Sequence, residues 1–288
     1  MKSLHLKIKE MATLTCVPQY MIEKDYALSY ALAGIVEQPE LSRSLIFKGG
    51  TALKKIFFGN YRFSEDLDFS TLHAPKNAAL ENALRNAMIH TKELLNTYGA
   101  FDLELKRKPE RNAHPRGQEA FIVSVKFPWH STSQCNLKIE ITHDEPVVLA
   151  PEYKSILHGY DEKIDCVVAC YHIEEIIAEK LRALLQTHEK LIMRGWNRSR
   201  ARDYYDLWNV LKNYSASIDT TRLIKTLDKK CKHRNVSYKT IDDFFTPELI
   251  SEANKHWEST LGNMLVGLPK CDLVLKETNI LIKKLLNF

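Results

Sequence analysis

The spacing of apolar residues alternates between helical and strand periods along the chain, and it predicts the first elements of the fold. Apolar side chains recur at helical spacing between residues 18 and 37, with no interior proline, which predicts a helix. The apolar run 45–47 predicts a short strand that ends at Gly49-Gly50. A second helix should follow the glycines, because residues 53–57 are apolar on one face.

The rest of the chain divides into a part rich in strands and a helical part. Residues 77–98 predict a long helix, with Gly99 at its C-cap. The period then changes to two, which predicts three strands, at 101–105, 121–127 and 137–141. From about residue 171 the spacing is helical to the end of the sequence, with helices expected around 173–185, 198–211, 247 onward and 273–286.

Strands that follow a long helix, without a regular strand–helix–strand repeat, are typical of the α+β class. We therefore expect a mixed sheet with helices in residues 1–165 and a helical bundle in residues 166–288. A chain of 288 residues is long enough for two domains with cores of their own.

The composition is that of an ordinary globular protein, with 44% hydrophobic residues, 27% charged residues and a net charge of +5. No stretch approaches the ~20 apolar residues that span a bilayer, and residues 1–7 lack the apolar core of a signal peptide. We expect a cytoplasmic protein with no membrane contact. Its six cysteines show no Cys-x-x-Cys pair and no zinc spacing, which favours reduced thiols over a metal site at Cys166 and Cys170.

The glycine pair lies where a predicted strand passes into a helix, a position suited to binding an anion. Glycines let the backbone approach a ligand closely. The first N–H groups of a helix have no intrahelical partners and attract phosphate. Gly49, Gly50 and Thr51 are therefore candidate ligands of the phosphates of a nucleotide, although a glycine pair is also typical of a simple turn.

Two aspartates, Asp66 and Asp68, follow in a strand-like stretch. Residues two apart in a strand point to the same face, and two neighbouring carboxylates are costly unless a cation lies between them. Such ligands suit Mg²⁺, which promotes nucleotidyl transfer. An exposed strand end also explains the pair, but its position after a glycine turn and a helix favours metal-dependent chemistry.

The first of these motifs resembles that of the AbiEii/AbiGii nucleotidyltransferase toxins, members of the DNA polymerase β-like superfamily. The residues that carry the resemblance are Lys48-Gly49-Gly50-Thr51-Ala52-Leu53 and Arg62-Phe63-Ser64-Glu65-Asp66-Leu67-Asp68-Phe69. It implies a polymerase β-like nucleotidyltransferase domain at residues 1–165 and a helical bundle domain at 166–288 that contributes to the active-site cleft.

The similarity begins at Glu23-Lys24-Asp25-Tyr26, extends to Asp206 and fades after about Leu211. Glu23, Lys24 and Asp25 match an early pattern of the family, but a solvated helix face explains them equally well. In the superfamily a third carboxylate comes from a later strand, so the resemblance implies that Glu140 completes the metal-binding set. An exposed glutamate on a strand with one polar face is the alternative.

A second motif is similar to later motifs of the same toxins: Glu179-Lys180-Leu181-Arg182-Ala183-Leu184, followed by Arg200-Ala201-Arg202-Asp203-Tyr204-Tyr205-Asp206-Leu207. By this resemblance Lys180 and Asp203 are catalytic or position the substrate, with Lys180 near the nucleotide and Asp206 in a structural role. Arg202 stands where the family has lysine; it keeps the charge but does not readily transfer a proton.

Ordinary structural roles remain open for this motif. Lys180 falls on the apolar stripe of its helix, where a lysine can bury its stem and extend its ammonium group to water. The acidic residues can also belong to ion pairs within and between helices, around Arg182, Arg200 and Arg202.

Two basic segments bear on the substrate: 106–117, and a cluster formed by Lys225, Lys229, Lys230, Lys232, His233 and Arg234. Basic segments are often only solvated surface, but beside a nucleotide site they favour an RNA acceptor, whose phosphates they can bind.

The sequence thus predicts a Mg²⁺-dependent nucleotidyltransferase that moves a nucleoside monophosphate from a nucleoside triphosphate to an acceptor hydroxyl. From the family, the acceptor is expected to be a tRNA 3′ end, and the protein the toxin of a toxin–antitoxin or abortive-infection pair with a separately encoded antitoxin. The alternatives are transfer to a protein or a small molecule, and a catalytically silent module that binds RNA or protein.

Overall fold

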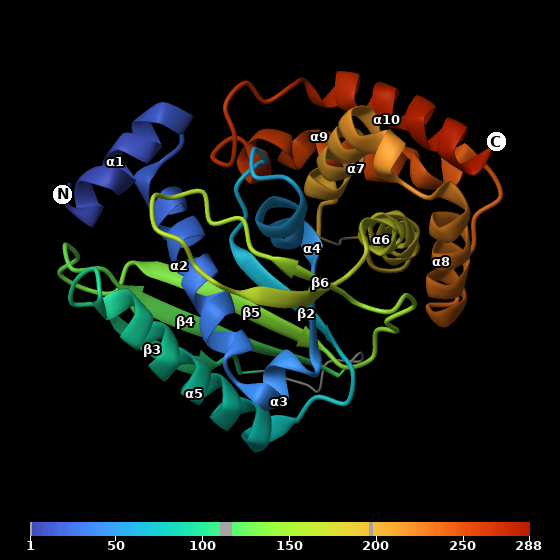
Figure 1. Ribbon diagram of the computed structural model, residues 1–288. Coiled ribbons are helices and arrows are strands. Elements are labelled where there is room, and N and C mark those ends of the chain that lie inside the picture. Colours follow the sequence, from blue (N-terminus) through green and yellow to red (C-terminus); the bar gives the residue numbers. More distant parts are fainter. Residues whose placement is uncertain (1, 110–116, 196–197) are drawn as a thin grey trace. The chain divides into compact units, whose positions relative to one another are not determined.

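The computed structural model describes residues 2–109, 117–195 and 198–288, and the chain divides into two compact units, Met1–Tyr171 and His172–Phe288. The first unit combines a mixed sheet with helices, and the second is helical (Figure 1). The expected α+β class is confirmed. None of the helices in these ranges has the length and apolar character needed to cross a bilayer.

The sheet of the first unit has the strand order β3-β4-β5-β2-β1-β7-β6. Strands β2 and β5 are parallel, as are β1 and β7, and the other neighbouring strands are antiparallel. The bounds are β1 Leu45–Lys48, β2 Asp66–Thr71, β3 Asp102–Arg107, β4 Gln118–Lys126, β5 Cys135–Thr142, β6 Glu152–Ser155 and β7 Val167–Cys170. The strands expected from period two are confirmed, whereas β6 and β7 were not expected.

Helices α2 (Gln19–Val36) and α5 (Asn77–Asn96) pack against each other, α2 against β5 and α5 against β3. In Figure 1, α2 crosses in front of β4 and β5. The apolar residues of the central strands, among them Phe47, Phe69 and Ile139, are buried. Because side chains alternate along a strand, the residues between them share the opposite face, which is where the polar candidates of β2 and β5 lie.

Helix α5 ends two residues earlier than expected. Its C-cap is Thr97, and Gly99 lies two residues beyond, with a φ of +152° and Pro128 close to where a Cβ would be. The glycine therefore serves the loop into β3 and is not the helix cap.

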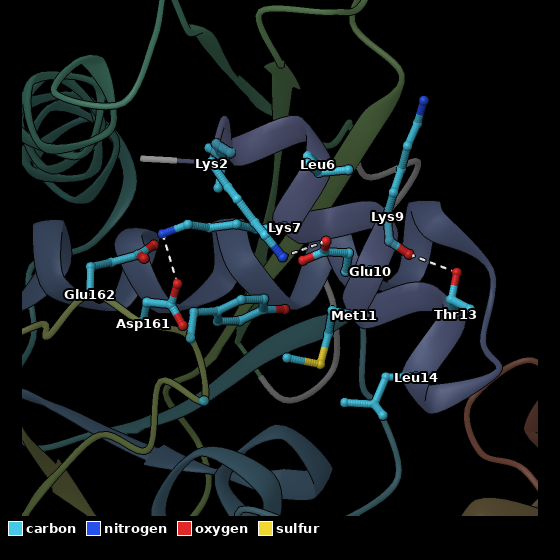
Figure 2. A pocket seen from close by; sticks show the side chains of 13 residues that line it. Lys2, Leu6, Lys7, Lys9, Glu10, Met11, Thr13, Leu14, Asp161 and Glu162 are labelled. Carbon is cyan, nitrogen blue, oxygen red and sulfur yellow. Dashed lines mark hydrogen bonds and ion pairs between the residues drawn. The ribbon is translucent and has the colours of Figure 1, made fainter.

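Helix α1 (Leu4–Thr15) was not expected from the sequence; a short helix α3 (Pro39–Ser42) follows α2. Ile8 anchors α1 in the core. Between α1 and residues 159–162 lies a pocket of about 830 Å³ (Figure 2), where the Lys7 ammonium nitrogen is 2.9 Å from an Asp161 oxygen. These contacts fix α1 to the loop after β6.

The second unit contains α6 Ile173–Arg194, α7 Ala201–Tyr214, α8 Thr220–His233, α9 Pro247–Leu261 and α10 Cys271–Leu286, with short 3₁₀ turns at Ser215–Ser217 and Ile241–Phe244. α6 packs on α8, and α7 packs on α9 and α10. The expected helical bundle is confirmed. Its α9 begins as the sequence predicts, with the Thr246 side chain accepting the Leu249 N–H and Pro247 in the first turn.

Candidate active site

The glycine pair follows β1 directly and opens a four-residue helix, α4 (Gly49–Ala52), which continues as one π-helical turn, η1 (Leu53–Phe57). Gly49 has a φ of +81°, a conformation that side chains other than glycine rarely adopt. A Cβ added to Gly49 would lie 2.6 Å from Oδ2 of Asp68. The glycine turn is thus packed directly against one of the two candidate metal ligands.

Asp66 and Asp68 lie on β2, on either side of the buried Leu67, so their side chains share a face as the sequence predicts. Asp68 stands between Lys48 of β1 and Glu140 of β5 in the strand register. Asp66 is paired with Lys138 of β5. This face of the sheet therefore alternates acidic and basic groups around the glycine turn.

Thr51 is buried, and its hydroxyl donates to the Asp66 carbonyl oxygen and lies 2.8 Å from the Ser64 hydroxyl. The hydroxyl thus joins α4 to the start of β2. Contact with a nucleotide at Gly49, Gly50 and Thr51 stays a prediction.

Glu140 lies beside Asp68, but its carboxylate already has protein partners. Its Oε1 is 2.5 Å from the Lys138 ammonium and accepts a hydrogen bond of 2.6 Å from the Gln118 amide. Among residues 2–109, 117–195 and 198–288 no group of three or more acidic, histidine or cysteine side chains could hold a metal ion. A role for Glu140 as third metal ligand stays a prediction.

In the second unit, Lys180 of α6 meets both aspartates of α7. Its ammonium nitrogen is 2.8 Å from Oδ1 of Asp203 and 2.7 Å from Oδ2 of Asp206. Lys180 is nearly buried and Asp206 completely so. The alternative in which Lys180 extends its ammonium group to water is wrong, because the aspartates hold its charge inside the unit. A contact of Lys180 with a nucleotide stays a prediction.

Arg200 adds a second cation, with a guanidinium nitrogen 3.2 Å from Oδ2 of Asp203. Burial raises the pKa of Asp203, but the charges of Lys180 and Arg200 outweigh it and hold that pKa well below its usual range. Asp203 is therefore ionised at neutral pH. The ion-pair interpretation holds for Arg200. The Arg202 guanidinium donates a hydrogen bond to the Thr260 carbonyl oxygen.

The sequence motif at 23–25 proves more than a solvated helix face. Glu23 and Asp25 are both buried in the first unit, while Lys24 is half-buried. Lys55, which we did not single out from the sequence, is buried beside Asp25 with a nitrogen–oxygen distance of 2.7 Å. The available signal was a pair of lysines, Lys54 and Lys55, shortly after the glycines and between the apolar residues Leu53 and Ile56.

The structure describes the first basic segment only in part and divides the second between core and surface. Residues 110–116 of the first lie outside the described residues, and Arg107 pairs with Glu81 and Glu119. In the second, Lys230 is wholly buried and its ammonium nitrogen is 3.1 Å from Glu175, so it is wrong to count it as surface charge. The exposed members are Lys225, Lys229, Lys232 and His233.

A glycine turn at the end of a strand, with two carboxylates on the neighbouring strand, is the arrangement of a nucleotidyltransferase, and the comparisons agree. The sequence pattern of the nucleotidyl transferase AbiEii toxin family, type IV toxin–antitoxin system, matches residues 30–277. The chain belongs to this family and is a nucleotidyltransferase.

A solved structure with a similar fold is MenT4, a nucleotidyltransferase toxin from Mycobacterium tuberculosis H37Rv. The two share 18% sequence identity with a TM-score of 0.61, over 94% of this chain and 85% of that one. No curated protein sequence matches the chain.

Proposed function

We propose that this protein transfers a nucleoside monophosphate from a nucleoside triphosphate to a hydroxyl at the 3′ end of tRNA, with divalent metal, as the toxin of a toxin–antitoxin pair. The observation that carries the proposal is the contact between Gly49 and Asp68. It sets a turn suited to phosphates directly against a carboxylate suited to metal.

The donor set fits Mg²⁺. Asp66 and Asp68 offer carboxylate oxygens from one face of β2, and Mg²⁺ is usually held by one or two carboxylates with waters and substrate phosphates completing its shell. Glu140 is the third carboxylate we assign to this site. When bound, the metal would neutralise charge on the phosphates and lower the pKa of the attacking hydroxyl.

The other residues bind and orient the substrate. The N–H groups that open α4, at Gly49, Gly50 and Thr51, would hold the triphosphate, and the absence of a side chain at Gly49 keeps that approach open. We assign Lys180 to the neutralisation of charge that develops on the phosphates, and Asp203 to holding Lys180 in place.

One feature supports a nucleic acid acceptor. Lys225, Lys229 and Lys232 are exposed on α8, where lysines can contact phosphates without regard to sequence. The family also implies a nucleoside triphosphate as substrate and a cognate antitoxin.

The test is incubation of the protein with Mg²⁺, total tRNA and each α-labelled nucleoside triphosphate in turn. The Asp66→Asn/Asp68→Asn variant should lose at least about 100-fold in rate, because the site then lacks its charged ligands. Asp165→Asn, which changes an exposed carboxylate of the same unit, is the matched control and should transfer at the normal rate.

The proposal is supported if the unmodified protein and Asp165→Asn label tRNA and Asp66→Asn/Asp68→Asn does not. The labelled nucleoside triphosphate then identifies the nucleotide. Label on protein or on a small molecule would overturn the tRNA acceptor. Equal transfer by all three proteins would overturn the assignment of the aspartates.

A further inference from the structure

The segment that carries the glycine turn has little stability of its own. α4 is a single turn, and η1 after it is a π-helix, closed by a 2.8 Å hydrogen bond from the Phe58 N–H to the Leu53 carbonyl oxygen. Isolated helices this short do not persist, and π-helical turns are rare and frequent at functional sites. The conformation of the turn must therefore be stabilised by contacts with other elements of the unit.

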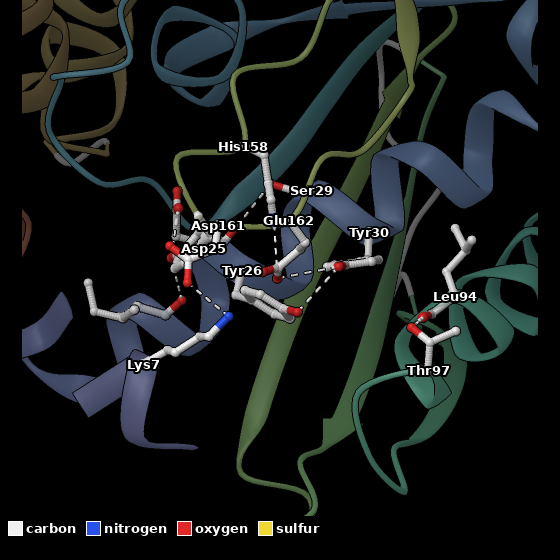
Figure 3. Close-up of polar contacts among 12 residues, drawn as sticks. Lys7, Asp25, Tyr26, Ser29, Tyr30, Leu94, Thr97, His158, Asp161 and Glu162 are labelled. Atoms are coloured by element: carbon white, nitrogen blue, oxygen red, sulfur yellow. Dashed lines mark hydrogen bonds and ion pairs between the residues drawn. The ribbon is translucent and has the colours of Figure 1, made fainter. Parts of the chain in front are cut away.

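Helix α2 supplies one such contact at the far end of the segment. Asp25 of α2 and Lys55 of η1 form an ion pair of 2.7 Å, with side chains only 5% and 1% exposed. The Tyr160 hydroxyl lies 3.1 Å from the same Asp25 oxygen, Oδ2. Figure 3 shows Asp25 among the polar side chains between α2 and residues 158–162.

A gain in the stability of the fold does not explain why a charged pair is buried here. Burying two charges costs free energy that their attraction only partly returns, and apolar residues of similar volume are often as stable. Within the described residues Oδ1 of Asp25 is also buried without a hydrogen-bond partner, which adds to the cost. What the pair does supply is a fixed distance between α2 and η1.

The residue next to Asp25 makes a second contact at the other end of the loop. Lys24 lies 2.8 Å from Glu65, the residue before Asp66. Successive residues of a helix point in different directions, so the Lys24-Asp25 dipeptide reaches both η1 and the start of β2. The segment between them, residues 55 to 65, leads from the glycine turn to the metal-binding strand.

Helix α2 is itself fixed in place close to Asp25, by contacts of Glu23. Glu23 is buried, accepts a 2.8 Å hydrogen bond from the Trp129 indole, and lies 3.2 Å from the His130 ring. These contacts tie α2 to the loop between β4 and β5. The helix can therefore act as a rigid support for the turn.

We propose that Asp25 is a positioning residue of the nucleotidyl transfer reaction. Its ion pair with Lys55 holds the glycine turn against Asp68, and the ion pair of Lys24 with Glu65 holds the other end of the same segment. Asp25 touches neither nucleotide nor acceptor. The proposal rests on the proposed function for its kinetic consequence, and on the structure alone for its effect on the turn.

The first variant is Asp25→Asn, compared with Asp102→Asn, which breaks the exposed ion pair of Asp102 with Lys92. Asp25→Asn should lower kcat about 100-fold, the effect of a displacement near 1 Å at a reacting centre, with KM for the nucleotide changed much less. Asp102→Asn should leave both constants unchanged.

Because Asp25→Asn leaves Lys55 charged and buried, it can also unfold the protein. A second set avoids this: Lys24→Glu and Glu65→Lys each place like charges together at a half-buried site, and the double exchange restores the pair. Each single variant should lower kcat, and the double variant should recover it.

Hydrogen exchange of peptides covering residues 48–69 is measured on the same proteins. Faster exchange there in the single variants, restored in the double exchange, supports positioning whether or not the tRNA assay succeeds. An active parent protein whose variants keep kcat and exchange would overturn the positioning role. An inactive parent protein with altered exchange in the variants would count against the proposed function alone.

Discussion

At the scale of single residues, Gly49 combines two constraints that can be separated. A side chain there must adopt a left-handed backbone conformation and must also displace the Asp68 carboxylate. Gly267 has a similar φ, +66°, with nothing within 4 Å of where a Cβ would be. Comparing the two glycines therefore isolates the contact with Asp68.

We expect Gly267→Ala to lower the free energy of unfolding by about 1–2 kcal/mol, the cost of the left-handed conformation, and to leave nucleotidyl transfer intact. Gly49→Ala should cost more in urea denaturation and should abolish transfer. Full activity in Gly49→Ala would show that the turn does not need its contact with Asp68.

The ion pair of Asp203 predicts an acid dependence of stability. Its pKa in the folded protein lies below the unfolded value of about 3.9, so the folded state favours the ionised form. That stabilisation is fully present above the unfolded pKa and is lost as the pH falls from about 4 toward the folded pKa. The free energy of unfolding, measured by urea denaturation across this range, should fall less steeply in Asp203→Asn than in the parent protein. An unchanged slope would contradict this assignment.

The relative orientation of side chains close in sequence can be predicted from the sequence. The shared face of Asp66 and Asp68 follows from the strand period alone, and the structure confirms it. The partners of Lys180 could not be predicted in the same way, because they depend on how α6 and α7 pack. A lysine on an apolar stripe is compatible with solvent or with a buried carboxylate, and the sequence does not distinguish them.

At the scale of elements, helix α8 shows how a basic segment divides between core and surface. Lys229 and Lys230 are neighbours in sequence, but Lys229 is exposed while Lys230 is buried against Glu175 of α6. Lys230→Met removes the ammonium group from this buried ion pair and should cost about 3–5 kcal/mol in urea denaturation. Lys229→Met should change stability by no more than about 0.5 kcal/mol. Equal effects of the two changes would contradict the packing of α8 on α6.

The elements missed from the sequence are short or depend on tertiary contacts. β7 has four residues, too few for a period to be recognised, and β6 is polar. The π-helical turn has no sequence signature, since its residues are ordinary for an α-helix. Helix α1 buries Ile8 as its one fully enclosed side chain, so its apolar face is weak.

At the scale of the whole molecule, the six cysteines report how well both units exclude solvent. Cys16 is exposed, whereas Cys135, Cys166, Cys170, Cys231 and Cys271 are buried, and all six are free thiols. Burial raises the pKa of each of the five buried thiols to about 12. Only the thiolate reacts with alkylating agents.

Iodoacetamide at about pH 8 should therefore modify the folded protein at Cys16 first, as read by mass spectrometry, and Cys16→Ser should remove this fast reaction. In urea all remaining thiols should react. Fast modification of a cysteine other than Cys16 in the native protein would show that its unit opens more readily than its burial indicates.

The packing of Gly49 on Asp68 also has a genetic consequence. Any single-base missense change in a glycine codon introduces a residue with a Cβ, so no such change at codon 49 avoids the collision. When the toxin is expressed without its antitoxin, surviving cells should carry missense mutations at codon 49 far more often than at codon 267. Sequencing the toxin gene of the survivors would measure these two frequencies. An excess at codon 49 would show that a single base change there is enough to inactivate the toxin.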